Sequence, residues 1–163
     1  MTTPLPTLIA FSDYGNDWNA YLEALYHIYL DEVVNAGITF RGLPLRVQFR
    51  PLSKGKGFGF WHLISEDDKG IGDEEERTPD FRRCERIRWV PWTILNVDSA
   101  PNFRWWENKR GHNTHVVLWF VEENFVVILA KRQGYYLLKS AYTLKPHRVK
   151  AFEKECNLFW RKG

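Results

Sequence analysis

The sequence contains the residue types that can cleave RNA without a metal ion: five histidines, a surplus of lysine and arginine, and several serine and tyrosine hydroxyls. A base that takes the proton of an RNA 2′-hydroxyl starts an in-line attack on the phosphate, and histidine suits this role at neutral pH. Lysine, arginine, serine and tyrosine can stabilise the charge that develops on the phosphorane. The chemistry therefore depends on which of these side chains the fold brings together.

The last third of the chain contains three β-rich runs, THVVLWFVE, NFVVILAKR and GYYLLKSAY, and FRWWE before them is a candidate fourth strand. The Gln-Gly pair at 133–134 fits a two-residue hairpin turn, and this turn places Ser140 opposite Val127. Because side chains alternate along a strand, the same register predicts one face that carries Lys131, Ser140 and Tyr142 together.

The place of His115 depends on the turn before the second of these strands. If residues 122–124 form a three-residue loop, His115 falls opposite Lys131, in one row with Tyr136. A two-residue loop sends His115 to the other face of the sheet. Both registers stay open from the sequence.

The centre of the chain contains an arginine-rich helix. Thr78 and Pro79 are good residues for a helix start, and we expect the helix to run to about Asn96 with a kink or a split at Pro91. Its first half carries four arginines, Arg82, Arg83, Arg86 and Arg88. Cations this close repel one another unless they meet carboxylates, such as Glu85, or phosphates. The cluster indicates either internal ion pairs or a polyanionic partner.

The net charge of +3 conceals a strong local acidity. Residues 66–76, EDDKGIGDEEE, hold seven acids and one lysine, and the rest of the chain has 22 basic and 13 acidic residues. The acidic segment is predicted to be a solvated loop, and the basic remainder favours a polyanion such as RNA as partner. A surface of mixed charges is the alternative.

The elements that position these residues predict an α+β fold, with an antiparallel sheet of about four to five strands packed against N-terminal, central and C-terminal helices. Helical spacing of apolar residues predicts a helix over 17–36, and ITFRGLPLRVQFRP predicts a strand with a bend. Pro146 is expected to start a C-terminal helix. We expect residues 1–163 to form a single domain, in which 1–40 is a helical extension and 41–163 the core.

Several classes of protein lack support in the sequence. No apolar run approaches the roughly 18 residues that cross a bilayer, and the first residues lack the pattern of a signal peptide. Cys84 and Cys156 fit no zinc spacing, and SKGKGFGF fits no nucleotide-binding loop. We therefore expect a cytoplasmic protein without a membrane segment, a metal or a cofactor.

Three segments resemble a phage- and plasmid-associated branch of the small endoribonucleases that include barnase, RelE toxins, tRNA-cutting colicins and poly-U-specific endonucleases. They are FWHLISE at 60–66, PDFRRCERIRWVPWTILN at 79–96 and NFVVILAKRQGYYLLKSAYTL at 124–144, the last with the strand ending Leu-Lys-Ser-Ala-Tyr. The resemblance implies metal-independent cleavage of RNA, with tRNA among the targets. It also implies a toxin-like role and an antitoxin or immunity protein as partner.

By this resemblance, His62 is the acid–base histidine, Ser140 and Tyr142 contact the scissile phosphate, and Lys131 and Arg83 stabilise its charge. Further contacts to nucleic acid are expected from Arg82, Arg83, Arg86, Lys109, Arg132 and His115. Each residue also has a structural interpretation, since Ser140 can bond within the sheet and His62 can be satisfied inside the core. The alternative functions are a non-catalytic nucleic-acid-binding module and a protein-interaction module of phage or plasmid origin.

Overall fold

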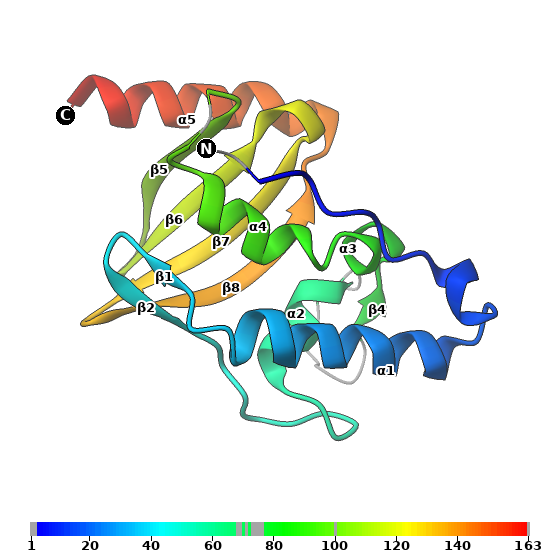
Figure 1. Cartoon of the computed structure of the whole chain (residues 1–163). Helices are drawn as coiled ribbons and strands as arrows, with labels where there is room; N and C mark the ends of the chain where they lie inside the picture. The colour runs from blue at the N-terminus through cyan, green and yellow to red at the C-terminus, as the bar shows by residue number, and fades with distance from the viewer. Residues whose placement is uncertain (1–2, 68–69, 71, 73–76, 100, 163) are drawn as a thin grey trace.

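The computed structural model of the chain describes residues 3–67, 70, 72, 77–99 and 101–162. It shows an α+β fold built around a six-stranded sheet with strand order β1-β2-β8-β7-β6-β5 (Figure 1). The helices are α1 (Trp18–Tyr29), α2 (Phe58–Ile64), α3 (Phe81–Glu85), α4 (Trp89–Asn96) and α5 (Val149–Lys162). The strands of the sheet are β1 (Thr39–Phe40), β2 (Leu43–Arg46), β5 (Phe103–Arg110), β6 (Asn113–Phe120), β7 (Phe125–Arg132) and β8 (Tyr135–Thr143). Two short strands, β3 (Ser65–Glu66) and β4 (Thr78–Pro79), pair separately.

The sheet is mixed, whereas the sequence predicts an antiparallel one. Strands β5 to β8 form the antiparallel run that the sequence predicts, with FRWWE inside β5. The segment predicted as one bent strand forms β1 and β2 instead, and β2 pairs with β8 in parallel, Leu45 opposite Tyr136. A parallel pair needs a long connection, and the helices between β2 and β8 provide it.

One face of the sheet, which we call the α4 face, packs against helices α1, α2 and α4. Leu118 and Val127 of the sheet lie in one buried cluster with Leu25 of α1 and Ile64 of α2. Alternating apolar residues on the strands and helical spacing of apolar residues on α1 produce these matching surfaces. The predicted N-terminal extension is therefore part of the main core.

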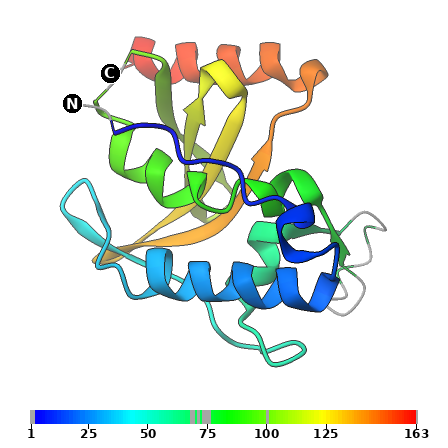
Figure 2. The same ribbon diagram turned by 45° about the vertical axis from the view of Figure 1, so that its right-hand side comes forward.

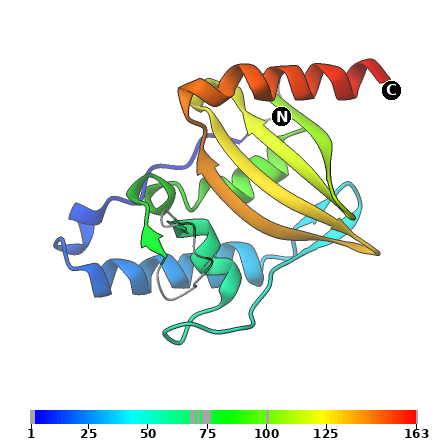
Figure 3. The same ribbon diagram turned by 180° about the vertical axis from the view of Figure 1, so that it is seen from behind.

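The opposite face, which we call the α5 face, is covered in part by α5. Phe152 and Cys156 of α5 pack against Trp119 and Val126, in a second buried cluster. The other cysteine, Cys84, lies in the core on the α4 face, and neither is in a disulfide. Figure 3 shows α5 across one end of the strands, with the remaining length of β6, β7 and β8 uncovered by helices.

The C-terminal hairpin confirms the predicted turn and corrects the predicted register. Arg132 pairs with Tyr135, as the turn at 133–134 requires. A β-bulge at Lys139 then shifts the pairing, so that Ser140 lies opposite Ile128 rather than Val127. An extra residue in one strand turns every later side chain to the other face. Ser140 and Tyr142 therefore lie on the α5 face, away from Lys131.

The preceding turn also differs from both loop lengths considered. Phe120 pairs with Phe125, so the loop has four residues, and its last residue, Asn124, adopts a left-handed conformation with φ 50°. His115 consequently lies opposite Ala130 on the α5 face, the face that the two-residue loop would also give it. The row of His115 with Lys131 and Tyr136, which the three-residue loop would give, does not form.

The helices begin and end near their predicted limits, with one exception. Asp17 caps α1, and five π-helical residues continue it to Val34. Thr78 and Pro79 belong to β4, while Asp80 caps α3 through the Arg82 N–H. The predicted second helix is split before Trp89, and Pro91 lies in the first turn of α4, where its missing N–H costs nothing.

The N-terminal segment lies across α4 (Figure 2). The indole N–H of Trp89 donates to the Pro6 carbonyl at 2.8 Å, and that of Trp92 donates to the Thr3 carbonyl at 3.0 Å. Over the residues that the structure describes, no helix combines the length and the apolar character that crossing a bilayer requires.

Candidate functional site

The candidate site is the part of the α5 face that α5 leaves uncovered. Two rows of side chains cross it, and their members are paired residues on β6, β7 and β8. They are Val117–Ile128–Ser140 and His115–Ala130–Leu137. His115, Ile128, Leu137 and Ser140 are half-buried, so this surface is partly accessible to solvent. The bulge at Lys139 gives the site its composition, because without it Ser140 would point into the opposite core.

His115 is surrounded by positive charge. Burial and the nearby cations Arg110, Lys139 and Arg132 together lower the pKa of His115 below its ordinary value. These cations come from three strands, β5, β8 and β7. A lowered pKa keeps the imidazole neutral at neutral pH, which is the state that can accept a proton.

A second group of cations lies around Tyr142. Burial raises the pKa of Tyr142, while Arg110, Arg148 and Arg83 act in the opposite direction. The guanidinium of Arg83 stands 5.7 Å from the centre of the tyrosine ring. Tyr142 therefore keeps its hydroxyl proton at neutral pH and can donate it to an anion. His115 and Tyr142 both lie on the α5 face, and Arg110 lowers the pKa of each. We call Arg83, Arg110, Arg132, Lys139 and Arg148 the basic face.

The end of α2 brings four of the sequence-predicted residues together. The Ser140 hydroxyl donates to the main-chain carbonyl of His62 at 3.3 Å, and Arg83 donates to the same carbonyl at 3.3 Å. Arg83 also donates to the Ser65 carbonyl at 2.7 Å. The last carbonyls of a helix lack partners within it, so these bonds cap α2. His62 thus meets Ser140, Arg83 and, through Arg83, Tyr142 by its backbone.

The imidazole of His62 has a different environment from its carbonyl. Its ring stacks on Phe58, one turn earlier in α2, with 4.2 Å between the ring centres. His62 and His115 come from different elements, α2 and β6, and the charges that lower the pKa of His115 belong to the sheet.

A pocket of about 240 Å³ adjoins Tyr142. Arg83, Lys145 and Arg148 line it, together with Glu66 and Asp80. Both acids lie near the Arg83 guanidinium, with closest N–O distances of 3.4 Å for Asp80 and 3.9 Å for Glu66. The cation at this corner is therefore partly neutralised by its own chain.

Four predicted contact residues lie outside this surface. Lys131 pairs with Glu107 at 3.4 Å on the α4 face. Arg86 meets Glu85 at 3.4 Å and stands over the Trp89 ring. The other two are Lys109, exposed on β5, and Arg82, exposed on α3.

The arginines of the central helices have different acidic partners among the described residues. Arg83 reaches Glu66 of that segment, but Arg88 pairs with Glu32 of the π-helical turn at 3.1 Å. Most of the predicted acidic loop, residues 68–69, 71 and 73–76, lies outside the described residues.

Sequence reasoning missed Arg110, Lys139 and Arg148. The Gly-His pair at 111–112 carries a signal for the first of them, since a two-residue turn pairs Arg110 with Asn113. Lys139 has no such signal, because its importance comes from the bulge.

Within the described part of the chain, no group of three or more His, Cys, Asp or Glu side chains is placed to hold a metal ion.

Comparisons of the chain with models of protein families, with curated proteins and with solved structures found no match.

Proposed function

We propose that the protein binds RNA along the basic face and cleaves it without a metal ion. The observation that carries the proposal is the half-buried His115 with Arg110, Arg132 and Lys139 around it. A neutral imidazole next to several cations is the combination that the reaction needs, because the base and the phosphate-stabilising charges must act on adjacent atoms.

In the proposed reaction, His115 takes the proton of a 2′-hydroxyl. The 2′-oxygen attacks the neighbouring phosphorus, the bond to the 5′-oxygen breaks, and a 2′,3′-cyclic phosphate remains. The leaving 5′-oxygen takes a proton from water, and His115 later returns its proton to solvent. Lys139, Arg110 and Arg132 stabilise the negative charge of the phosphorane.

The corner around Tyr142 is proposed to hold the adjacent part of the strand. His115 and Ser140 stand on strands separated by β7, so about 10 Å of sheet lies between them. The Tyr142 hydroxyl and the Arg148 guanidinium suit a neighbouring phosphate, while Ser140 serves to position the end of α2. This division assigns the role of general base to His115. The family resemblance would assign that role to His62.

Purified protein incubated with RNA in EDTA tests the proposal, with product ends analysed for cyclic phosphate. We expect His115→Gln to lower the cleavage rate by about 10²–10⁴-fold, the usual contribution of a general base, while RNA affinity changes little. His147→Gln is the matched control, because this exposed histidine lies at the start of the C-terminal helical segment. If His115 is the general base, His62→Gln should leave the cleavage rate close to that of the wild type. If His62 is the base, His62→Gln should lower the rate and His115→Gln should not.

Intact RNA at high concentrations of wild-type protein would reject cleavage. If that protein still bound RNA, the basic face would be a non-catalytic binding surface.

The proposed toxin role rests on the resemblance and has its own test. Expression of wild-type protein in a bacterium should arrest growth, and expression of His115→Gln should not.

A further inference from the structure

β5 is one of the two outermost strands of the sheet, and no strand of the described chain pairs with its outer edge. Two hydrogen bonds fix the direction of its backbone groups. The Asn102 carbonyl accepts from Val121 on the β6 side, whereas the Trp105 carbonyl accepts from the indole of Trp160 in α5 at 2.7 Å. Backbone groups alternate along a strand. The N–H and C=O groups of Trp105, Glu107 and Lys109 therefore point outward.

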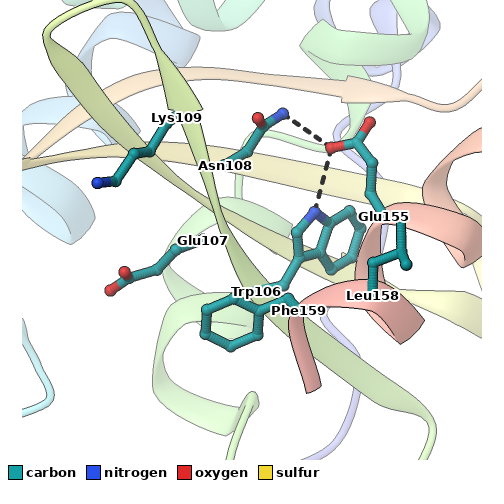
Figure 4. A pocket seen from close by; sticks show the side chains of 7 residues that line it. All are labelled: Trp106, Glu107, Asn108, Lys109, Glu155, Leu158 and Phe159. Carbon is teal, nitrogen blue, oxygen red and sulfur yellow. Dashed lines mark hydrogen bonds between the residues drawn. The ribbon is translucent and has the colours of Figure 1, made fainter. Parts of the chain in front are cut away.

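The side chains of this edge divide between the two faces (Figure 4). Trp106 and Asn108 point toward α5, where both donate to Oε1 of Glu155, at 3.3 Å and 2.7 Å. Glu107 and Lys109 lie on the other side of the strand. A pocket of about 370 Å³ lies between the edge and α5.

We propose that the β5 edge pairs with the same edge of a second copy of the chain, antiparallel and with Asn108 opposite Asn108. This register follows from charge. It places Glu107 of each copy opposite Lys109 of the other, so that two opposite-charge pairs form across a two-fold axis. Each pair would exchange two backbone hydrogen bonds through the outward groups.

Neighbouring registers are less favourable. A shift of two residues either way puts Glu107 opposite Glu107 or Lys109 opposite Lys109, and like charges directly opposite each other are destabilising. Lysine on an edge strand ordinarily discourages pairing. In the proposed register, an acid of the second copy compensates for it.

The same register places complementary groups on the α5 side. Arg110 of the second copy falls opposite Trp106, beside Glu155, whose two hydrogen bonds both use Oε1. The Oε2 oxygen can then accept from that guanidinium. Gly111 falls opposite Trp105, where Trp160 occupies the edge, and glycine has no side chain to collide with it.

The dimer would join two sheets into one and make their α5 faces continuous. Arg110 would be drawn toward the acid of the second copy, and Arg132 and Lys139 would remain beside His115. The dimer shares Arg110 with the basic face, but its backbone pairing and its Glu107–Lys109 pairs do not depend on RNA cleavage.

Sedimentation equilibrium over a range of protein concentrations tests the pairing. Wild-type protein should dimerise, and Glu107→Lys or Lys109→Glu alone should weaken dimerisation by about tenfold or more, since each creates two like-charge pairs. The double variant Glu107→Lys/Lys109→Glu restores both opposite pairs across the axis and should recover dimerisation in part, because it still lacks the Glu107–Lys131 ion pair within each chain. Lys150→Glu, a charge reversal at an exposed position of α5, is the matched control.

Circular dichroism and thermal unfolding establish that each variant is folded. A monomer at every wild-type concentration would overturn the proposal. So would single variants that dimerise as tightly as the wild type, or a double variant that stays as weak as either single one.

Discussion

At the scale of single residues, side chains of the same type in similar local sequences have different surroundings in the fold. His62 and His115 both follow or precede apolar residues, yet His62 stacks on Phe58 and His115 lies among cations. Arg83 illustrates the same point, because its hydrogen bonds to two carbonyls at the end of α2 give it a structural task. We therefore expect substitution of Arg83 to affect stability as well as RNA binding.

The pH dependence of cleavage should report on His115. A general base must be neutral, so kcat/KM should rise with pH through a midpoint below 6.5, the ordinary pKa of histidine, and then level off. Lys139→Ala removes one of the charges that lower this pKa, so the midpoint should move upward. The pH profiles of the two proteins, measured at low substrate, provide the comparison. A midpoint above 6.5, or one that Lys139→Ala leaves in place, would contradict the assignment.

The residues of the site were predictable as types and only partly as a group. Ser140 and Tyr142 are on the same face, as alternation requires, and the structure brings Arg83 and the His62 backbone to them. Lys131 was grouped with them only because the bulge was missed. A single extra residue, such as Lys139, cannot be recognised from the alternation of apolar residues before it, and it has already moved the residues after it to the other face.

At the scale of elements, the bulge in β8 decides what the uncovered sheet presents. Before it, Tyr136 and Leu138 point into the α4-face core, and after it Ala141 does so. The turns at 133–134 and the order of β5 to β8 follow from local sequence, and both were predictable. The parallel pairing of β2 with β8 was not, because it joins segments about ninety residues apart whose contact depends on helix packing.

Deletion of Lys139 should preserve the two faces of β8. It joins Leu138 to Ser140, whose partners Leu129 and Ile128 are already adjacent in β7, so Ser140 and Tyr142 stay on the α5 face and Ala141 stays in the α4-face core. We therefore expect a loss of only about 1 kcal/mol in the free energy of unfolding. Lys139→Ala keeps the bulge and should stay within about 0.5 kcal/mol of the wild type. Urea denaturation measures both. A loss of about 3 kcal/mol or more on deletion would show that the packing of β8 requires the bulge itself.

At the scale of the whole molecule, the distribution of charge matters more than its sum. The chain carries a net charge of only +3, but five cations gather on the α5 side of the sheet and its margins. The α4 face carries Lys131 together with its partner Glu107. A polyanion should therefore bind to the α5 side of the molecule in preference to the α4 face.

The salt dependence of RNA binding tests this asymmetry. Each phosphate contact on a single strand contributes about 0.7 to the slope of log K against log salt, so Lys139→Ala should reduce the slope by about that amount. Lys131→Ala removes the same charge from the other face and should leave the slope unchanged. Fluorescence anisotropy with labelled single-stranded RNA at several salt concentrations provides the values. Equal changes in the two variants would indicate that binding is not confined to the basic face.

The two cysteines stand on opposite sides of the sheet, Cys84 beneath the α4 face and Cys156 beneath α5. Burial raises the pKa of Cys84 to about 12 and raises that of Cys156 as well, so both thiols stay protonated and inert while the protein is closed. Either thiol can react only when its own layer of helices lifts from the sheet. The native chain thus carries a separate chemical reporter of local opening for each of its two layers.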